Sequence, residues 1–251
     1  MSLKPEDAAA LIEQTRSPGT VLVGGQAVAF WARYFDIPAK LPALTRDIDY
    51  LGTRTEAKLA SDRLSFPNDL KLASFDDATP NTASLTVKMA GYPEPVIIDY
   101  LSGVVGLDAR RIRSSAVEVE FRGHRLKVLH PLQLLQAKFW NLYRLPEKRT
   151  AEGVEQARLA VEIASAYVQG LIESKAPRRE SLRAVQSIAG FAATAPARYV
   201  KETHDLDCLN AVPQAVFKEG VLPRLFHERR WPQLVSAATK RKARRSRPRG
   251  R

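Results

Sequence analysis

The chain has few of the residues that build disulfide frameworks, zinc sites or membrane spans. Its 251 residues include one cysteine, Cys208, and four scattered histidines. A single cysteine excludes an internal disulfide and fits a reducing cytoplasm, and the histidines show no zinc-ligand spacing. No apolar run is long enough for a membrane span, and the first residues lack the layout of a signal peptide. We therefore expect a cytoplasmic protein that does not associate with a membrane.

Acidic residues are absent from the last part of the chain. The segment Ser236–Arg251 contains eight lysines and arginines, which account for +8 of the formal net charge of +12. The other 235 residues are therefore only mildly basic. We predict a disordered basic tail over residues 236–251, which would bind phosphate groups and lose affinity steeply with salt. The two interpretations left open are a nucleic-acid contact and a solubilising extension.

Strand patterns fill the first half of the chain, and helix patterns fill the second. Val96–Leu101 reads as a core strand, and Val117–Phe121 begins a hairpin that turns near Gly123. After Pro131, apolar residues recur at helical spacing. We predict an α+β protein in which a mixed sheet flanked by helices (residues 1–130) is followed by a helical domain packed on it (131–235).

A glycine pair follows the first predicted strand. Gly24 and Gly25 come directly after the apolar Val21–Val23 and precede an almost wholly apolar helix near residues 26–35. Glycine lets the backbone turn tightly, and the N–H groups at a helix start can face a phosphate. The pattern predicts either a phosphate-binding turn or an ordinary strand-to-helix turn.

Three aspartates lie on later predicted strands. Asp47 and Asp49 are one residue apart, so their side chains share a face of the strand Thr45–Leu51. Two like charges on a buried strand are costly unless a cation such as Mg²⁺ lies between them. Asp99, near the end of the Val96–Leu101 strand, could join a second metal and accept a proton from an attacking hydroxyl. The alternatives are ion pairing of the aspartate pair with Arg46 or Arg54, and a strand-end acid without a catalytic role at Asp99.

These motifs resemble the nucleotidyltransferases with a DNA polymerase β-like core. That family has a strand ending in Gly-Gly or Gly-Ser, then an aspartate–any–aspartate strand, then a third acid on a later strand. Val21–Ala27 and Thr45–Asp49 look most like the branch of AbiEii/AbiGii-type toxins, and His130–Lys138 resembles a helix of that branch. The resemblance covers roughly residues 18 to 140.

The resemblance implies a two-metal magnesium site that moves a nucleoside monophosphate from an NTP to an acceptor hydroxyl. Asp47, Asp49 and Asp99 would hold the metals. Gly24, Gly25 and Lys138 would contact the nucleotide, although Lys138 could instead extend to solvent. The acceptor could be RNA or tRNA, and a toxin-like protein could have an antitoxin partner.

Two alternatives to this function follow from the same sequence. One is a catalytically inactive module of this fold that binds RNA or a protein. The other is a small-molecule adenylyltransferase of the aminoglycoside-modifying kind, in which acids of the helical half, such as Glu152, Glu155 and Glu162, would line an acidic cleft.

Overall fold

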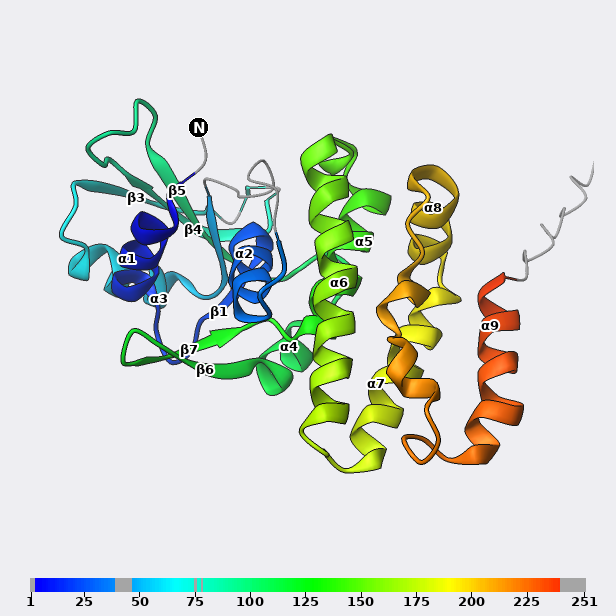
Figure 1. Ribbon diagram of the computed structural model, residues 1–251. Helices are drawn as coiled ribbons and strands as arrows, with labels where there is room; N and C mark the ends of the chain where they lie inside the picture. Colours follow the sequence, from blue (N-terminus) through cyan, green and yellow to red (C-terminus); the bar gives the residue numbers. More distant parts are fainter. Residues whose placement is uncertain (1–2, 39–46, 75, 78, 240–251) are drawn as a thin grey trace, which may run out of the picture.

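The computed structural model describes residues 3–38, 47–74, 76–77 and 79–239. Within them, strands form one mixed seven-stranded sheet in the order β3-β4-β5-β2-β1-β7-β6 (Figure 1). The strands are β1 (Val21–Val23), β2 (Ile48–Leu51), β3 (Asn68–Leu72), β4 (Asn81–Val87), β5 (Val96–Leu101), β6 (Val117–Phe121) and β7 (His124–Val128). The protein is thus of the α+β class, and its sheet is confined to the first half of the chain.

Two helices cover one face of this sheet. α1 (Pro5–Thr15) lies over the central strands, where Thr15 contacts two buried tyrosines. The hydroxyls of Tyr50 and Thr15 are 3.0 Å apart, and Tyr100 donates to the Thr15 carbonyl over 3.0 Å. α3 (Arg54–Arg63) packs against α1, β3 and β4. Since neighbouring residues of a strand point to opposite faces, Asp49 and Asp99 lie on the other face.

The start of α3 shows why this helix begins where it does. Thr53 Oγ1 accepts from the backbone N–H of Glu56, and Glu56 Oε2 accepts from the Thr53 N–H over 2.7 Å. This reciprocal capping satisfies two N–H groups that a helix start leaves without intrahelical partners. The Thr-x-x-Glu pattern is in the sequence, so this boundary is set locally.

The second half of the chain consists of helices stacked beside the sheet (Figure 1). The α-helices there are α5 (Pro131–Arg144), α6 (Ala151–Glu173), α7 (Arg178–Ala192), α8 (Ala195–His204) and α9 (Trp231–Thr239). One buried apolar cluster surrounds the sheet and includes Leu134 of α5 and Ile163 of α6, and a second fills the helical half. Because α5 and α6 contribute to both clusters, they join the two halves; a domain boundary at residue 130 remains a prediction.

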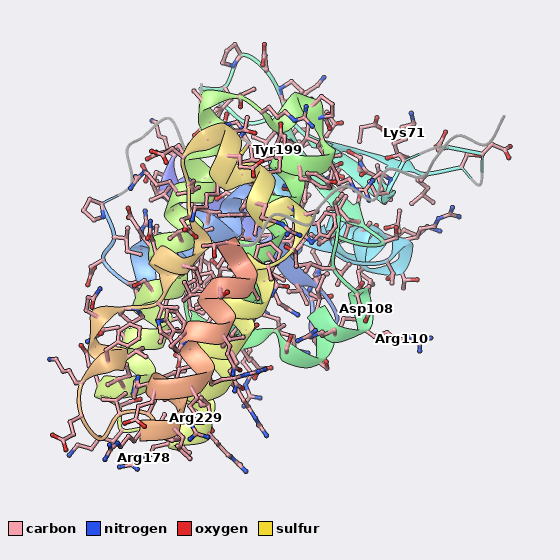
Figure 2. The ribbon with its side chains drawn as sticks, turned by 90° about the vertical axis from the view of Figure 1, so that its right-hand side faces the viewer. Lys71, Asp108, Arg110, Arg178, Tyr199 and Arg229 are labelled. Atoms are coloured by element: carbon pink, nitrogen blue, oxygen red, sulfur yellow. The ribbon has the colours of Figure 1, made fainter. Side chains whose placement is uncertain are left out.

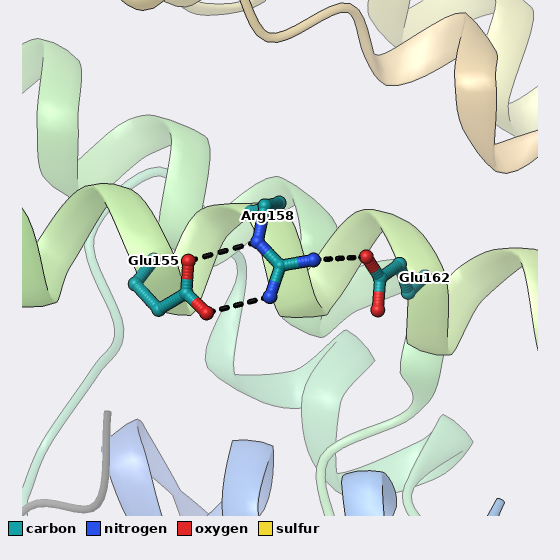
Figure 3. Close-up of polar contacts among 3 residues, drawn as sticks. All are labelled: Glu155, Arg158 and Glu162. Carbon is teal, nitrogen blue, oxygen red and sulfur yellow. Dashed lines mark hydrogen bonds and ion pairs between the residues drawn. The ribbon is translucent and has the colours of Figure 1, made fainter. Parts of the chain in front are cut away.

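One side of α6 carries a partly buried three-residue ion network (Figure 3). Arg158 donates to both carboxylate oxygens of Glu155, over 2.8 and 2.5 Å, and its third nitrogen contacts Glu162. These residues are spaced three and four apart, so they are neighbours on the helix surface. The network takes up two of the three acids that the small-molecule hypothesis placed in an acidic cleft.

Two boundaries and one short helix differ from the sequence expectation. β2 starts at Ile48, so Asp47 lies one residue before the strand. A short helix, α4 (Ala109–Ser115), is capped by Asp108 and was not predicted. α9 continues to Thr239, whose hydroxyl donates to the carbonyls of Val235 and Ser236, so the last helix runs four residues past the expected end of the helical domain at residue 235; the bounds of the basic tail remain a prediction. The remaining tail, 240–251, lies outside the described residues.

Candidate active site

Strand register brings two of the predicted aspartates together. Asp49 of β2 is the direct partner of Asp99 on the parallel strand β5, although 50 positions separate them in the chain. Neighbouring strands lie about 4.8 Å apart, and register partners point to the same face. The two carboxylates are therefore adjacent on the face opposite α1 and α3.

The glycine turn lies against the same carboxylate. Val23 is the register partner of Asp49 across the antiparallel β1–β2 pair, and Gly24 follows it with a φ of +66°. A Cβ atom at Gly24 would lie 1.8 Å from Asp49 Oδ2. Only glycine leaves room for the carboxylate there, because any side chain would collide with it and favour a different backbone conformation.

Gly24 also begins α2 (Gly24–Tyr34), and Gly25 is buried in its first turn. Val23, which precedes the helix, makes no side-chain hydrogen bond to that turn. The first N–H groups of a helix have no intrahelical partner and carry partial positive charge. The turn thus presents N–H groups beside Asp49, as an anion-binding site requires.

Lys138 of α5 reaches toward this site from the helical half. Its side chain is buried, and its Nζ donates to Gln156 Oε1 of α6 over 2.7 Å. Burial lowers the pKa of Lys138 to about 8, against the opposing effect of Asp49. Lys138 therefore does not extend to solvent; it is held inside the protein by Gln156, within electrostatic range of Asp49.

The charges around Asp49 oppose one another. Burial raises the pKa of Asp49; Lys138 acts against that effect, and Asp99 adds to it. Lys148, from a 3₁₀ turn at Pro146–Lys148, also lowers it, and Asp47 contributes a further small increase. The negative charge of these two adjacent, half-buried acids is therefore only partly offset by Lys138 and Lys148.

A divalent cation fits this arrangement. Asp99 Oδ1 is buried and, among the described residues, has no hydrogen-bond partner, which is costly for a carboxylate oxygen. A hard cation between Asp49 and Asp99 would satisfy that oxygen and offset the repulsion between the acids. No three His, Cys, Asp or Glu side chains in the described part of the chain are already grouped as a metal site. The place of Asp47 in a three-carboxylate set remains a prediction.

Two contributors to the site were missed in the sequence. Gln156 and Lys148 follow Lys138 by 18 and 10 residues, and only the packing of α5 on α6 brings them beside it. No motif marks either residue. Arg46, considered as a partner for the aspartates, lies outside the described residues.

No described helix is both long and apolar enough to cross a membrane. No protein-family model matches the chain, and no curated protein matches it either. Among solved structures, it is similar to the crystal structure of the Megavirus polyadenylate synthase, with a TM-score of 0.38 and 14% sequence identity. That alignment covers 71% of this chain and 37% of the viral one, so the chain spans little more than a third of that protein's length.

Proposed function

We propose that the protein is a magnesium-dependent nucleotidyltransferase whose reaction takes place at Asp49 and Asp99. The observation that carries the proposal is the direct register of these two acids beside the Gly24 turn. Adjacent carboxylates next to the N–H groups of a helix start are what phosphoryl transfer requires, since the reaction depends on positioning and charge neutralisation.

Each residue has a separate task in this proposal. The N–H groups of Gly24 and Gly25 receive the triphosphate of the NTP. Asp99 accepts the proton as the acceptor hydroxyl oxygen bonds to the α-phosphorus, and the bond from that phosphorus to the β-phosphate oxygen breaks to release pyrophosphate. Lys138, held by Gln156, supplies positive charge beside Asp49.

Asp49 and Asp99, with Asp47 as a third ligand, would hold Mg²⁺, and the cation would supply positive charge against the negative charge of the reacting phosphate. The acceptor we favour is RNA, including tRNA, and the basic tail is a further contact for it. Assignment to the toxin-like branch, and with it an antitoxin partner, rests on the sequence resemblance. An inactive module of the same fold is the competing function.

Transfer assays with Asp49→Asn test the proposal. Each labelled NTP is incubated with Mg²⁺, total RNA and the protein, and labelled product is measured. Since burial already raises the pKa of Asp49, a neutral isostere should leave the fold intact while transfer is lost. Asp62→Asn, on the exposed surface of α3, is the matched control and should retain activity. Near-normal transfer by Asp49→Asn would refute the assignment, and absence of product with the unaltered protein would favour the inactive module.

A further inference from the structure

The row of polar residues that contains the two acids continues across two more strands. Ser84 of β4 is the register partner of Asp99, and Lys71 of β3 is the register partner of Ser84. Register partners share a face, so Asp49, Asp99, Ser84 and Lys71 lie side by side on the face opposite α1 and α3. With strands about 4.8 Å apart, the row extends about 14 Å from Asp49 to Lys71 at the sheet edge.

The outer end of this row is hollowed. A groove of about 440 Å³ lies over β3 and β4, and the residues that line it include Lys71, Asp77, Thr79, Asn81 and Ser84. Figure 2 shows the Lys71 side chain at the margin of the β half. The groove begins next to Asp99, because Ser84 both lines the groove and pairs with that acid.

The groove has unused hydrogen-bonding groups at both ends. Within the described residues, the side chains of Lys71 and Ser84 make no hydrogen bond or ion pair, while Asp77 Oδ2 already accepts from the Ser74 N–H over 2.7 Å. Hydroxyl and amide groups suit the hydroxyls of a sugar ring, and a lysine at the outer end suits a phosphate. Lys71 could also serve only to discourage pairing of the edge strand β3 with another chain. That role alone would not explain why a groove leads from Lys71 to Asp99.

From these observations we infer that the β3–β4 groove is the acceptor subsite and takes a phosphorylated sugar. The hydroxyl that attacks lies near Asp99 and Ser84, and a phosphate of the same acceptor lies at Lys71. A polynucleotide end and a mononucleotide share this chemistry. This inference rests on the proposed function, because only a transferase has an acceptor. Occupation of the groove, however, can be measured by binding without any transfer reaction.

A cysteine reporter can detect occupation of the groove. The native Cys208 is buried, and burial raises its pKa to about 12, so it reacts slowly with a maleimide. Ala73→Cys places one accessible thiol in the groove and leaves Lys71 unchanged. Lys58→Cys, on the exposed side of α3 and thus on the other face, is the control reporter.

Maleimide labelling is timed alone and with each of four probes: a 12-nucleotide single-stranded RNA, adenosine monophosphate, an NTP with Mg²⁺, and kanamycin. We expect RNA or the monophosphate to slow labelling at position 73 at least fivefold and to leave position 58 unchanged; the arm that protects identifies the source. In the Ala73→Cys background, Lys71→Ala should abolish protection, whereas Lys88→Ala, an exposed lysine just beyond β4, should not.

Three results would overturn the inference. Protection by the NTP with Mg²⁺ alone would make the groove part of the nucleotide site. Protection only by kanamycin would show that the groove takes an unphosphorylated cationic sugar. Unchanged labelling with every probe would leave Lys71 as an edge-strand residue only. Since no outcome requires transfer, loss of the groove and loss of the proposed function are separate results.

Discussion

Replacing Gly24 by alanine tests the centre of the site with one methyl group. The new Cβ would lie 1.8 Å from Asp49 Oδ2, about 1.6 Å short of an ordinary contact at 3.4 Å. The carboxylate must therefore move by more than 1 Å, or the turn must open. A left-handed backbone at a non-glycine residue costs a further 1–2 kcal/mol, roughly.

The matched control separates these two effects. Gly123, in the β6–β7 hairpin, has a φ of +73°, and a Cβ there would meet no atom within 4 Å. Gly123→Ala therefore carries the backbone cost without the collision. The backbone cost should lower the free energy of unfolding in urea by about 1–2 kcal/mol in both variants. Gly24→Ala should lose more than Gly123→Ala, because it also displaces Asp49.

Function should separate the two variants further. Displacement of a catalytic group by about 1 Å can cost on the order of 100-fold in rate. We expect Gly24→Ala to lose transfer by about that factor and to bind Mn²⁺, measured by calorimetry, at least tenfold more weakly, roughly 1.4 kcal/mol. Gly123→Ala should match the unaltered protein in both assays. Equal Mn²⁺ affinity and equal stability in the two variants would refute the close approach of Gly24 to Asp49.

Two further predictions concern stability. Burial lowers the pKa of His130 to about 4, and its ring Nδ1 accepts from the Leu132 N–H at the start of α5. In the unfolded chain this histidine binds a proton below about pH 6.5, so the stability that neutral His130 contributes is complete above that pH and is lost as pH falls toward 4, by about 3 kcal/mol in total. His130→Asn keeps a capping acceptor and should remove that part of the difference in unfolding free energy between pH 7 and pH 4.5, measured with urea. An unchanged difference would contradict the assignment. Thr53→Ala breaks the α3 capping box and should cost about 1 kcal/mol without changing transfer; loss of transfer with a normal fold would show that the start of α3 contributes to the site.

Local features of the fold could be predicted because their partners are near in sequence. The Thr53–Glu56 cap and the turn at Gly123 each depend on residues within a few positions. The Gly24 turn also follows from its neighbours, although α2 begins two residues earlier than expected. The short α4 was missed because seven residues with one buried side chain, Ile112, give too little periodicity to detect.

The sequence by itself determined which residue types were available to the candidate site: a glycine pair after a buried strand, and acids on two later strands. Tertiary structure decided that Asp49 pairs with Asp99, that Lys138 is buried against Gln156 beside them, and that Ser84 and Lys71 extend the row. The register of two parallel strands joined by a long connection has no local signal in the sequence. Here the register of β2 and β5 is set by the burial of Tyr50 and Tyr100 together under α1. The side chains opposite those tyrosines were thereby aligned as well.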